Sequence, residues 1–171
     1  MKEYRSPHIA LLWSLAIPGF GQIYNKDYLA GVLLVVLEFL INTRANLNLS
    51  ILYSFRGQFW LACQSANLQW LLFYPCVYSF ASWHAYTRAL QNNRNGSRVL
   101  ADEQSPSFIG QFIGVAAGGT LGIIYSYYIG PVLCGLIGMG LGCAAGFIVE
   151  HLLRKPDGEY GGQNSNKKPA E

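Results

Sequence analysis

The residue of this sequence best placed to do chemistry is an acidic one inside an apolar segment. Glu38 lies ten positions after the start of a predicted apolar helix at Tyr28. A carboxyl group in that setting can carry a proton or bind a transported ion, and it is expected to face protein or a water-filled cavity. The alternative is a structural hydrogen bond from Glu38 to Gln69 or Ser79. Glu38 is therefore the candidate transport residue.

No pattern typical of an active site or a cofactor site accompanies Glu38. His84 and His151 lie near helix ends without a nucleophile, an orienting acid or a second ligand at helical spacing. The four cysteines show no CxxC spacing, so we expect no metal, no cofactor and no redox centre. The net charge of +3 is too small to indicate a nucleic-acid partner. The sequence predicts that the protein is not an enzyme.

The composition indicates a membrane protein. Hydrophobic residues make up 51% of the chain and charged residues 12%, about half the charged share of a soluble domain. Range 108–149 contains no Lys, Arg, Asp, Glu or His and is interrupted by YSYYIGP. Because roughly 20 apolar residues cross a bilayer, this range predicts two membrane helices joined by a tight turn. The first residues resemble a secretory signal, but the apolar run that follows predicts that they are retained.

Two glycine ladders are the most specific pattern in the chain. The first consists of Gly110, Gly114, Gly118 and Gly122, and the second of Gly130, Gly138, Gly142 and Gly146, with Cys134 at the intervening step. A step of four advances about 400° on a helix, so each ladder lies on one slowly winding face. Small residues let membrane helices approach closely. The pattern resembles the glycine-zipper hairpins of bacterial envelope proteins. The ladders are expected either to pack on each other or to face outward and drive self-association, even a pore.

A proline, glycines and polar residues interrupt the first apolar run, in the stretch AIPGFGQIYNKDYLAG at 16–31. Proline and glycine force the chain to turn here. The polar side chains can satisfy the backbone groups that such a break exposes. Asn25 or Asp27 is expected to be the N-cap of the helix that begins near Tyr28. The stretch is predicted to be a structural turn, with a ligand-binding loop as the alternative.

This stretch resembles a Pro-Gly-x-Gly-Gln-x-Tyr-Asn signature followed by a glycine, found in small bacterial multi-pass membrane proteins of uncharacterised function. The matching residues are Pro18, Gly19, Gly21, Gln22, Tyr24, Asn25 and Gly31. It is more distantly similar to the two-transmembrane-helix hairpin domain, whose acidic-arginine-aromatic core is replaced here by Lys26, Asp27 and Tyr28. The resemblance covers residues 9 to about 42 and implies a helical hairpin, not a reaction.

Counting basic residues predicts the topology. We expect an all-α, polytopic membrane bundle with four full spans and a short N-terminal re-entrant or broken helix. Range 50–63, with Arg56 at its middle, is expected to lie in the interface. This arrangement puts both termini and most Lys and Arg in the cytoplasm, as the positive-inside rule requires. A six-span alternative, in which 9–24 and 50–63 also cross, keeps both termini cytoplasmic.

The predicted organisation has six parts. They are an N-terminal broken helical hairpin (1–42), an outer loop with an interfacial helix (43–67), a central transmembrane helix (68–90), a cytoplasmic connector (91–107), a glycine-ladder transmembrane hairpin (108–153) and a disordered tail (154–171). The expected location is the bacterial cytoplasmic (inner) membrane. The leading hypothesis is a non-catalytic assembly or scaffold component whose partners are the lipid bilayer and other membrane helices, from the same or another protein. The alternative is a small channel or transporter subunit that uses Glu38 and the glycine-lined contacts.

Overall fold

A computed structural model describes residues 4–94 and 108–153, and all regular structure in these two ranges is α-helical. The prediction of an all-α protein is therefore confirmed. The helices are α1 (Pro7–Ala16), α2 (Phe20–Tyr24), α3 (Tyr28–Ala45), α4 (Leu47–Phe55), α5 (Phe59–Ser65), α6 (Leu68–Leu71), α7 (Tyr74–Arg94), α8 (Ile109–Ile124) and α9 (Pro131–Leu153).

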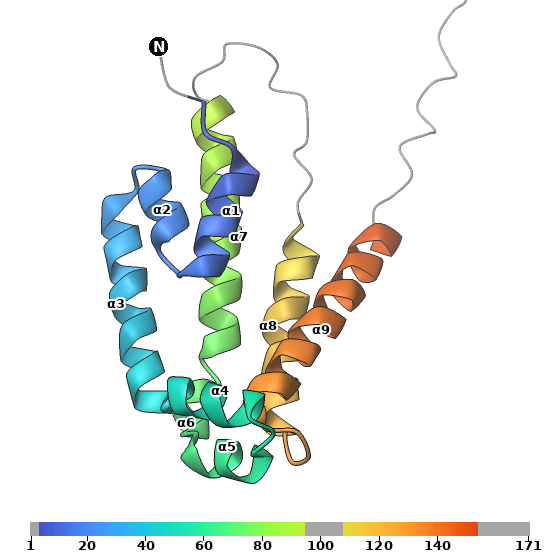
Figure 1. The fold of residues 1–171 in the computed structure, drawn as a ribbon. Coiled ribbons are helices and arrows are strands. Elements are labelled where there is room, and N and C mark those ends of the chain that lie inside the picture. Colours follow the sequence, from blue (N-terminus) through green and yellow to red (C-terminus); the bar gives the residue numbers. More distant parts are fainter. Residues whose placement is uncertain (1–3, 95–107, 154–171) are drawn as a thin grey trace, which may run out of the picture.

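Four long helices, α3, α7, α8 and α9, run side by side with alternating directions (Figure 1). The short helices α4, α5 and α6 cross one end of them, and we call these three helices the crossing layer. At the opposite end, α1 and α2 fold back on each other against α7. Ser6 begins this fold as the N-cap of α1, with its Oγ 3.5 Å from the backbone nitrogen of Ile9.

The central helix differs from the prediction at both ends. The predicted helix at 68–90 is split, because α6 ends at Leu71 and α7 begins at Tyr74. Pro75 lies in the first turn of α7, where a helix tolerates a residue without an N–H group. The helix then continues to Arg94, so the first residues of the predicted connector 91–107 are helical. The rest of that connector and the predicted tail 154–171 lie outside the described residues.

The crossing layer also differs from the prediction, which placed one interfacial helix in range 50–63. The structure divides it into α4 and α5, and Gly57 at the break has a φ of 71°, in the left-handed region that favours glycine. Asn46, with a φ of 52°, makes the similar turn between α3 and α4. A small apolar cluster joins this layer to the long helices: Ala45, Leu47, Leu71 and Ile123.

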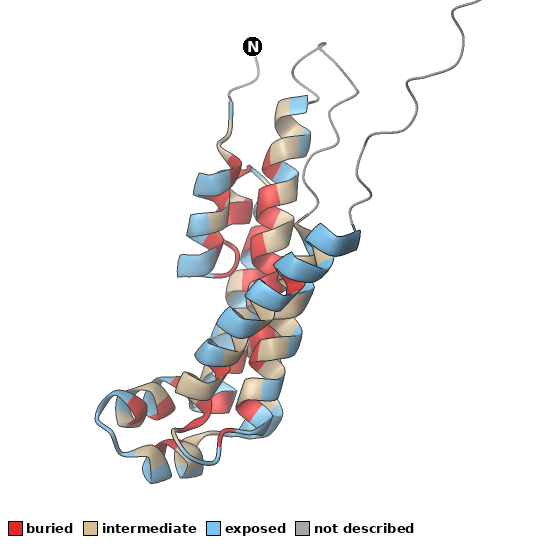
Figure 2. Ribbon diagram, turned by 90° about the vertical axis from the view of Figure 1, so that its right-hand side faces the viewer, coloured by how far each residue is buried: buried red, intermediate tan, exposed pale blue. Residues whose placement is uncertain are grey.

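Small residues are buried between α1 and α7, and many large apolar side chains of the long helices point outward. The fully buried positions of α1 and α7 include Ala10, Ala81 and Ala85. Leu29 on α3 and Leu141 on α9 are in contrast 76% and 68% exposed. Figure 2 shows the same division, with buried residues along the inward sides of the helices and exposed ones outside. Small residues therefore bring α1 and α7 close together, whereas the crossing layer packs through larger side chains such as Leu47 and Leu71.

Two helices, α3 and α9, are long and apolar enough to cross a membrane. The 23 residues of α9 extend about 34 Å at 1.5 Å per residue, which matches the ~30 Å apolar core of a bilayer. Only 11% of the most apolar window of α9 is buried inside the protein, whereas the core helix of a water-soluble fold is mostly buried. These two helices support a membrane location.

Candidate functional site

The side chain of Gln22 joins three helices inside the N-terminal half. Gln22 is fully buried, and its Nε2 donates to the backbone oxygen of Ala81 on α7 at 2.8 Å. Its Oε1 accepts from the hydroxyl of Ser14 on α1 at 3.3 Å. Nε2 also lies 3.4 Å from Nδ1 of His84, one turn further along α7. Since buried amides are costly unless they are hydrogen-bonded, this residue fixes where α1 and α2 sit on α7.

Asn25 repeats the same contact one helical turn later. Its Nδ2 donates to the backbone oxygen of Ala85 at 2.7 Å, and its own backbone oxygen accepts from the side chain of Asn92 at 3.4 Å. Both Gln22 and Asn25 therefore donate to backbone oxygens of α7 that also accept hydrogen bonds within that helix. We call this set of contacts, made by Gln22 and Asn25 to α7 and by Ser14 to Gln22, the polar dock.

A further layer of contacts closes the outer end of the polar dock. The hydroxyl of Tyr24 accepts from the backbone nitrogen of Ser6 at 3.3 Å. The guanidinium of Arg5 lies 5.3 Å from the centre of the Tyr24 ring, within cation–π range. The side chain of Asn93, on the last turn of α7, pairs with the backbone of Arg5 through two hydrogen bonds of 3.0 and 2.7 Å. The chain before α1 is thus tied to the end of α7.

The glycines and proline of the signature stretch make the turn close enough for the polar dock to form. Gly19 has a φ of 109°, and a Cβ on it would collide with the backbone oxygen of Gly31. A Cβ on Gly21 would strike the carbonyl of Ala10, and one on Gly31 would lie 2.6 Å from Cγ1 of Ile23. Pro18 is fully buried beside them. The structure therefore brings all seven signature residues into one compact turn.

The prediction that Asn25 or Asp27 is the N-cap of α3 is confirmed in position but not in its hydrogen bond. Asp27 occupies the N-cap position, but its side chain makes no capping hydrogen bond. Its carboxylate lies 3.7 Å from Nε of Arg88 instead. Asn25, the other candidate, is used by α7. Neither side chain caps α3, because both are directed toward α7 and not toward the first backbone N–H groups of α3.

In the C-terminal half, the two glycine ladders face each other across α8 and α9. A Cβ on Gly114 would collide with the backbone oxygen of Gly142, and one on Gly118 with that of Gly138. The outer rungs repeat this relation, in the pairs Gly110 with Gly146 and Gly122 with Cys134. The two backbones are therefore in direct contact over the full length of α8. We call this contact the glycine hairpin.

Gly130 is an exception to the predicted ladder. It precedes α9 and has a φ of 84°, so it turns the chain and does not pack α9 on α8. A Cβ there would approach Ser54 and Ala62 of the crossing layer. Sequence reasoning missed Gly119, where a Cβ would lie 2.8 Å from Cβ of Pro75 and 2.7 Å from Cγ of Met139. Gly119 joins the glycine hairpin to α7, and the adjacent glycine pair at 118–119 was its only sequence signal.

The carboxylate of Glu150, near the end of α9, binds the first turn of α8. Its Oε2 accepts from the backbone nitrogen of Gly110 at 3.1 Å, in the first turn of α8. Phe108, the N-cap of α8, supplies no side-chain hydrogen bond of its own. A negative charge at a helix N-terminus is favourable, because the first N–H groups there lack intrahelical partners. Glu150 was also missed, although it stands one ladder step after Gly146.

Glu38 has a different partner from those predicted. The hydroxyl of Tyr74 on α7 donates to Oε1 of Glu38 at 2.6 Å, and Nδ2 of Asn42 lies 3.4 Å from the same oxygen. The ring of Tyr78 stacks on that of Tyr74 with a centroid distance of 5.0 Å. Ser79, one of the predicted partners, donates instead to the backbone oxygen of Phe112 on α8. Glu38 therefore joins α3 to α7.

The histidines and cysteines do not come together. His84 lies by the polar dock, and the ring of His151 stacks on Phe147 at the far end of α9. Within residues 4–94 and 108–153, no group of three or more His, Cys, Asp or Glu side chains could hold a metal ion. All four cysteines are free thiols, and Sγ of Cys63 lies 3.7 Å from the backbone oxygen of Ser126. Burial, with a smaller effect from nearby Cys134, raises the pKa of the Cys63 thiol.

These features define a class of protein: an all-α chain with two helices long and apolar enough to cross a membrane, joined internally by a polar dock and a glycine hairpin. No protein-family model matches the chain, and neither a curated protein nor a solved structure matches it. The resemblances stated from the sequence therefore stay predictions.

Proposed function

We propose that this chain is an integral membrane protein of a bacterial inner membrane in which α3, α7, α8 and α9 span the bilayer. The alternating directions of these helices support this topology (Figure 1). So do the basic residues of the described ranges, because Arg5, Lys26, Arg88 and Arg94 gather at the α1 end and only Arg44 and Arg56 lie at the crossing layer. By the positive-inside rule, the α1 end faces the cytoplasm.

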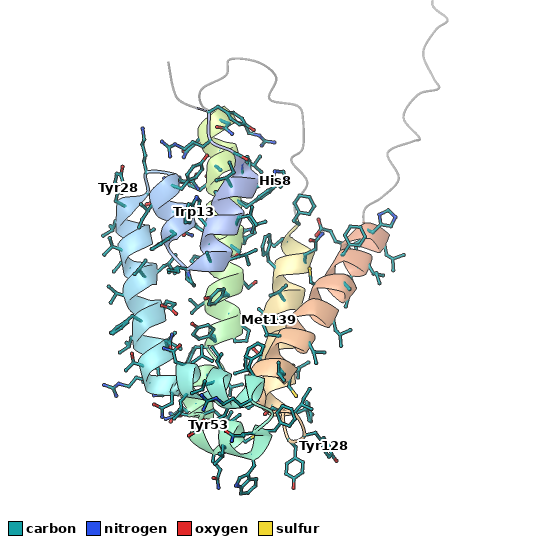
Figure 3. The ribbon with its side chains drawn as sticks, in the orientation of Figure 1. His8, Trp13, Tyr28, Tyr53, Tyr128 and Met139 are labelled. Atoms are coloured by element: carbon teal, nitrogen blue, oxygen red, sulfur yellow. The ribbon has the colours of Figure 1, made fainter. Side chains whose placement is uncertain are left out.

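Aromatic side chains support the same orientation of the bundle. Tyr53 and Tyr128 lie at the crossing-layer end (Figure 3), and Tyr127 and Trp60 are among the most exposed side chains of that end. Tyr and Trp prefer the level of the lipid headgroups. The crossing layer therefore lies in the outer membrane–water interface.

The length of α1 and α2 favours a re-entrant hairpin over the six-span alternative. The ten residues of α1 extend about 15 Å, half of the ~30 Å apolar core. The chain then turns at Gly19 and returns through α2 to the end where it started. Hydrogen bonds within the turn, such as those from the nitrogens of Phe20 and Ile23 to the oxygens of Ile17 and Gly19, pair backbone groups that the turn would otherwise expose to lipid.

Within this topology we propose a non-catalytic role in assembly, in which another membrane helix packs on α9. The observation that carries the proposal is the small-residue face of α9 that the glycine hairpin leaves uncovered. Gly140 has no atom within 4 Å of the place of a Cβ, and Ala144, one turn further, is exposed. Small residues four apart on an exposed face allow a second helix to approach closely in lipid. The contacts of Glu38 with Tyr74 and Asn42 favour its structural role over a transport role.

Crosslinking of the full chain in native membranes tests this role. We expect the wild type to give a defined crosslinked complex, with a second copy or with one other membrane protein, and Gly140→Leu to lose it. Ala117→Leu places a leucine at an exposed position of α8 and should keep the complex. A wild type that stays monomeric, or a complex that survives Gly140→Leu, would contradict the assembly role. An ion flux in liposomes that disappears in Glu38→Gln would replace it with the channel alternative.

A further inference from the structure

An apolar cavity of about 260 Å³ lies between the crossing layer and the long helices. Leu47, Ile51 and Phe55 of α4 form one side of it, and Val132, Leu136 and Met139 of α9 form another. Residues of α6, α7 and α8 complete the walls. The cavity is not part of the polar dock, the glycine hairpin or the uncovered face at Gly140.

The chemistry of the lining selects an apolar occupant. Tyr74 and Tyr78 are the only lining residues whose side chains carry an oxygen or nitrogen atom. The hydroxyl of Tyr74 is already bound to Glu38 on α3. The cavity is far larger than the ~10–15 Å³ that admits one water, but a water there needs two to four polar partners. An apolar cavity of roughly 150 Å³ stays dry and binds benzene, so this larger one is suited to a hydrocarbon group.

The edge of the cavity opens on the apolar surface of the protein. Phe55 and Leu136 line it and are also 73% and 55% exposed, so hydrocarbon can enter between them without crossing a polar barrier. Arg56 follows Phe55 directly and is exposed at the same end of the bundle. A cation at that level attracts the phosphate of a lipid headgroup.

We propose that this cavity binds an acyl chain of a bilayer phospholipid. The inference rests on the membrane location proposed above, because in a bilayer the acyl chains are the apolar groups at by far the highest concentration. The phosphate lies near Arg56, and the chain enters between Phe55 and Leu136 to fill the space against Ile51 and Met139.

Photo-crosslinking of the full chain in phosphatidylethanolamine and phosphatidylglycerol vesicles tests the site. The probe is phosphatidylglycerol with a diazirine in one acyl chain, and mass spectrometry locates the labelled residues. Leu136→Trp fills the cavity mouth, at a position exposed enough to tolerate the larger side chain. Leu141→Trp is the matched control, because Leu141 lies on the same helix, is exposed and does not line the cavity. Leu152, 77% exposed, reports contact with bulk lipid.

We expect Ile51 and Met139 to be labelled in the wild type and in Leu141→Trp. In Leu136→Trp the labelling of these two residues should fall at least fivefold. The labelling of Leu152 should be the same in all three proteins. Equal labelling of Ile51 in Leu136→Trp, or its absence in a wild type that is labelled at Leu152, would overturn the site. Absence of the Leu152 label as well would instead contradict the membrane location. A second arm uses a free fatty acid that carries the diazirine. Labels at Ile51 from the fatty acid but not from the phospholipid would overturn the choice of phospholipid.

Discussion

The two halves of the molecule hold their helices together by opposite means. In the polar dock, side-chain amides of α2 reach the backbone oxygens of α7, and the contact depends on two residues, Gln22 and Asn25. In the glycine hairpin no side chain intervenes, and the backbones of α8 and α9 touch. Lipid offers no hydrophobic drive for helices to associate, so close packing and hydrogen bonds are the two available sources of stability. This chain therefore uses hydrogen bonds to join helices in its N-terminal half and close backbone packing to join them in its C-terminal half.

The largest expected effect comes from adding a side chain inside the glycine hairpin. Gly142→Leu places atoms where the carbonyl of Gly114 lies, and rigid backbone cannot yield as a side chain can. We expect a loss of about 3 kcal/mol or more in the free energy of unfolding, at the upper end for overpacking. Thermal unfolding in detergent measures it. Gly140→Leu, two residues away in open space, is the control and should change stability little. Equal effects of the two would mean that α8 and α9 do not pack along the ladders.

A single substitution in the polar dock should lower the free energy of unfolding less than one in the glycine hairpin. Gln22→Leu removes the hydrogen bonds to Ala81 and Ser14 and leaves a buried hydroxyl without its partner, at a cost of about 1–3 kcal/mol. We expect α1 and α2 to detach while the glycine hairpin stays folded. Trypsin cleavage at Lys26 should therefore speed up, with cleavage elsewhere unchanged. A control is Gln91→Leu, at an exposed position near the end of α7. Cooperative unfolding of both halves in Gln22→Leu would show that the halves are not independent.

The packing of the two glycine ladders on each other was one of two alternatives that the sequence offered, whereas the polar dock was not foreseen, for a physical reason. A ladder is a local period of four, so its face can be read from residue spacing alone. The partners of Gln22 and Asn25 are backbone oxygens, which every residue possesses, so no pattern could identify Ala81 and Ala85. Gly130 was misplaced because a turn glycine with a positive φ falls on the same count of four as the ladder.

The break before α7 was missed for a related reason. Apolar composition runs unbroken through 68–86, and composition reports burial or lipid contact but not helix ends. Pro75 was the available signal, because proline is favoured in the first turn of a helix. The contact of Glu38 with Tyr74 depends on where α7 begins, so the wrong boundary also gave the wrong partner.

A smaller effect is expected for the hydrogen bond between α3 and α7. Tyr74→Phe removes the donor to Glu38 and should cost about 1–2 kcal/mol, in the range for a hydrogen bond to a carboxyl group. A double-mutant cycle with Glu38→Gln, followed by thermal unfolding, isolates the pairwise energy. Tyr128→Phe, which removes a hydroxyl from an exposed side chain away from Glu38, is the control. Coupling near zero would return Glu38 to the list of candidate transport residues.

The smallest effect concerns the rate at which Cys63 reacts with a maleimide. Burial raises the pKa of this thiol, so at a given pH less of it is thiolate than at an exposed cysteine. Its labelling rate should therefore rise at higher pH than that of a cysteine placed at Lys26, each in a background without other cysteines. A few-fold difference at neutral pH is expected. In intact cells the first should react from outside and the second be protected. Labelling of both from outside would favour six spans.

A ladder of regularly spaced glycines does not by itself fix its alignment, because a slide of four residues brings most of the small residues opposite one another again. After such a slide α8 and α9 would still form three of their four small-residue pairs. The hydrogen bond from the Gly110 nitrogen to Glu150 would not survive it, because the carboxylate would move about 6 Å along the axis, at 1.5 Å per residue. The side chain of Glu150 thus favours one pairing of the α8 and α9 glycines, which their regular spacing alone does not determine.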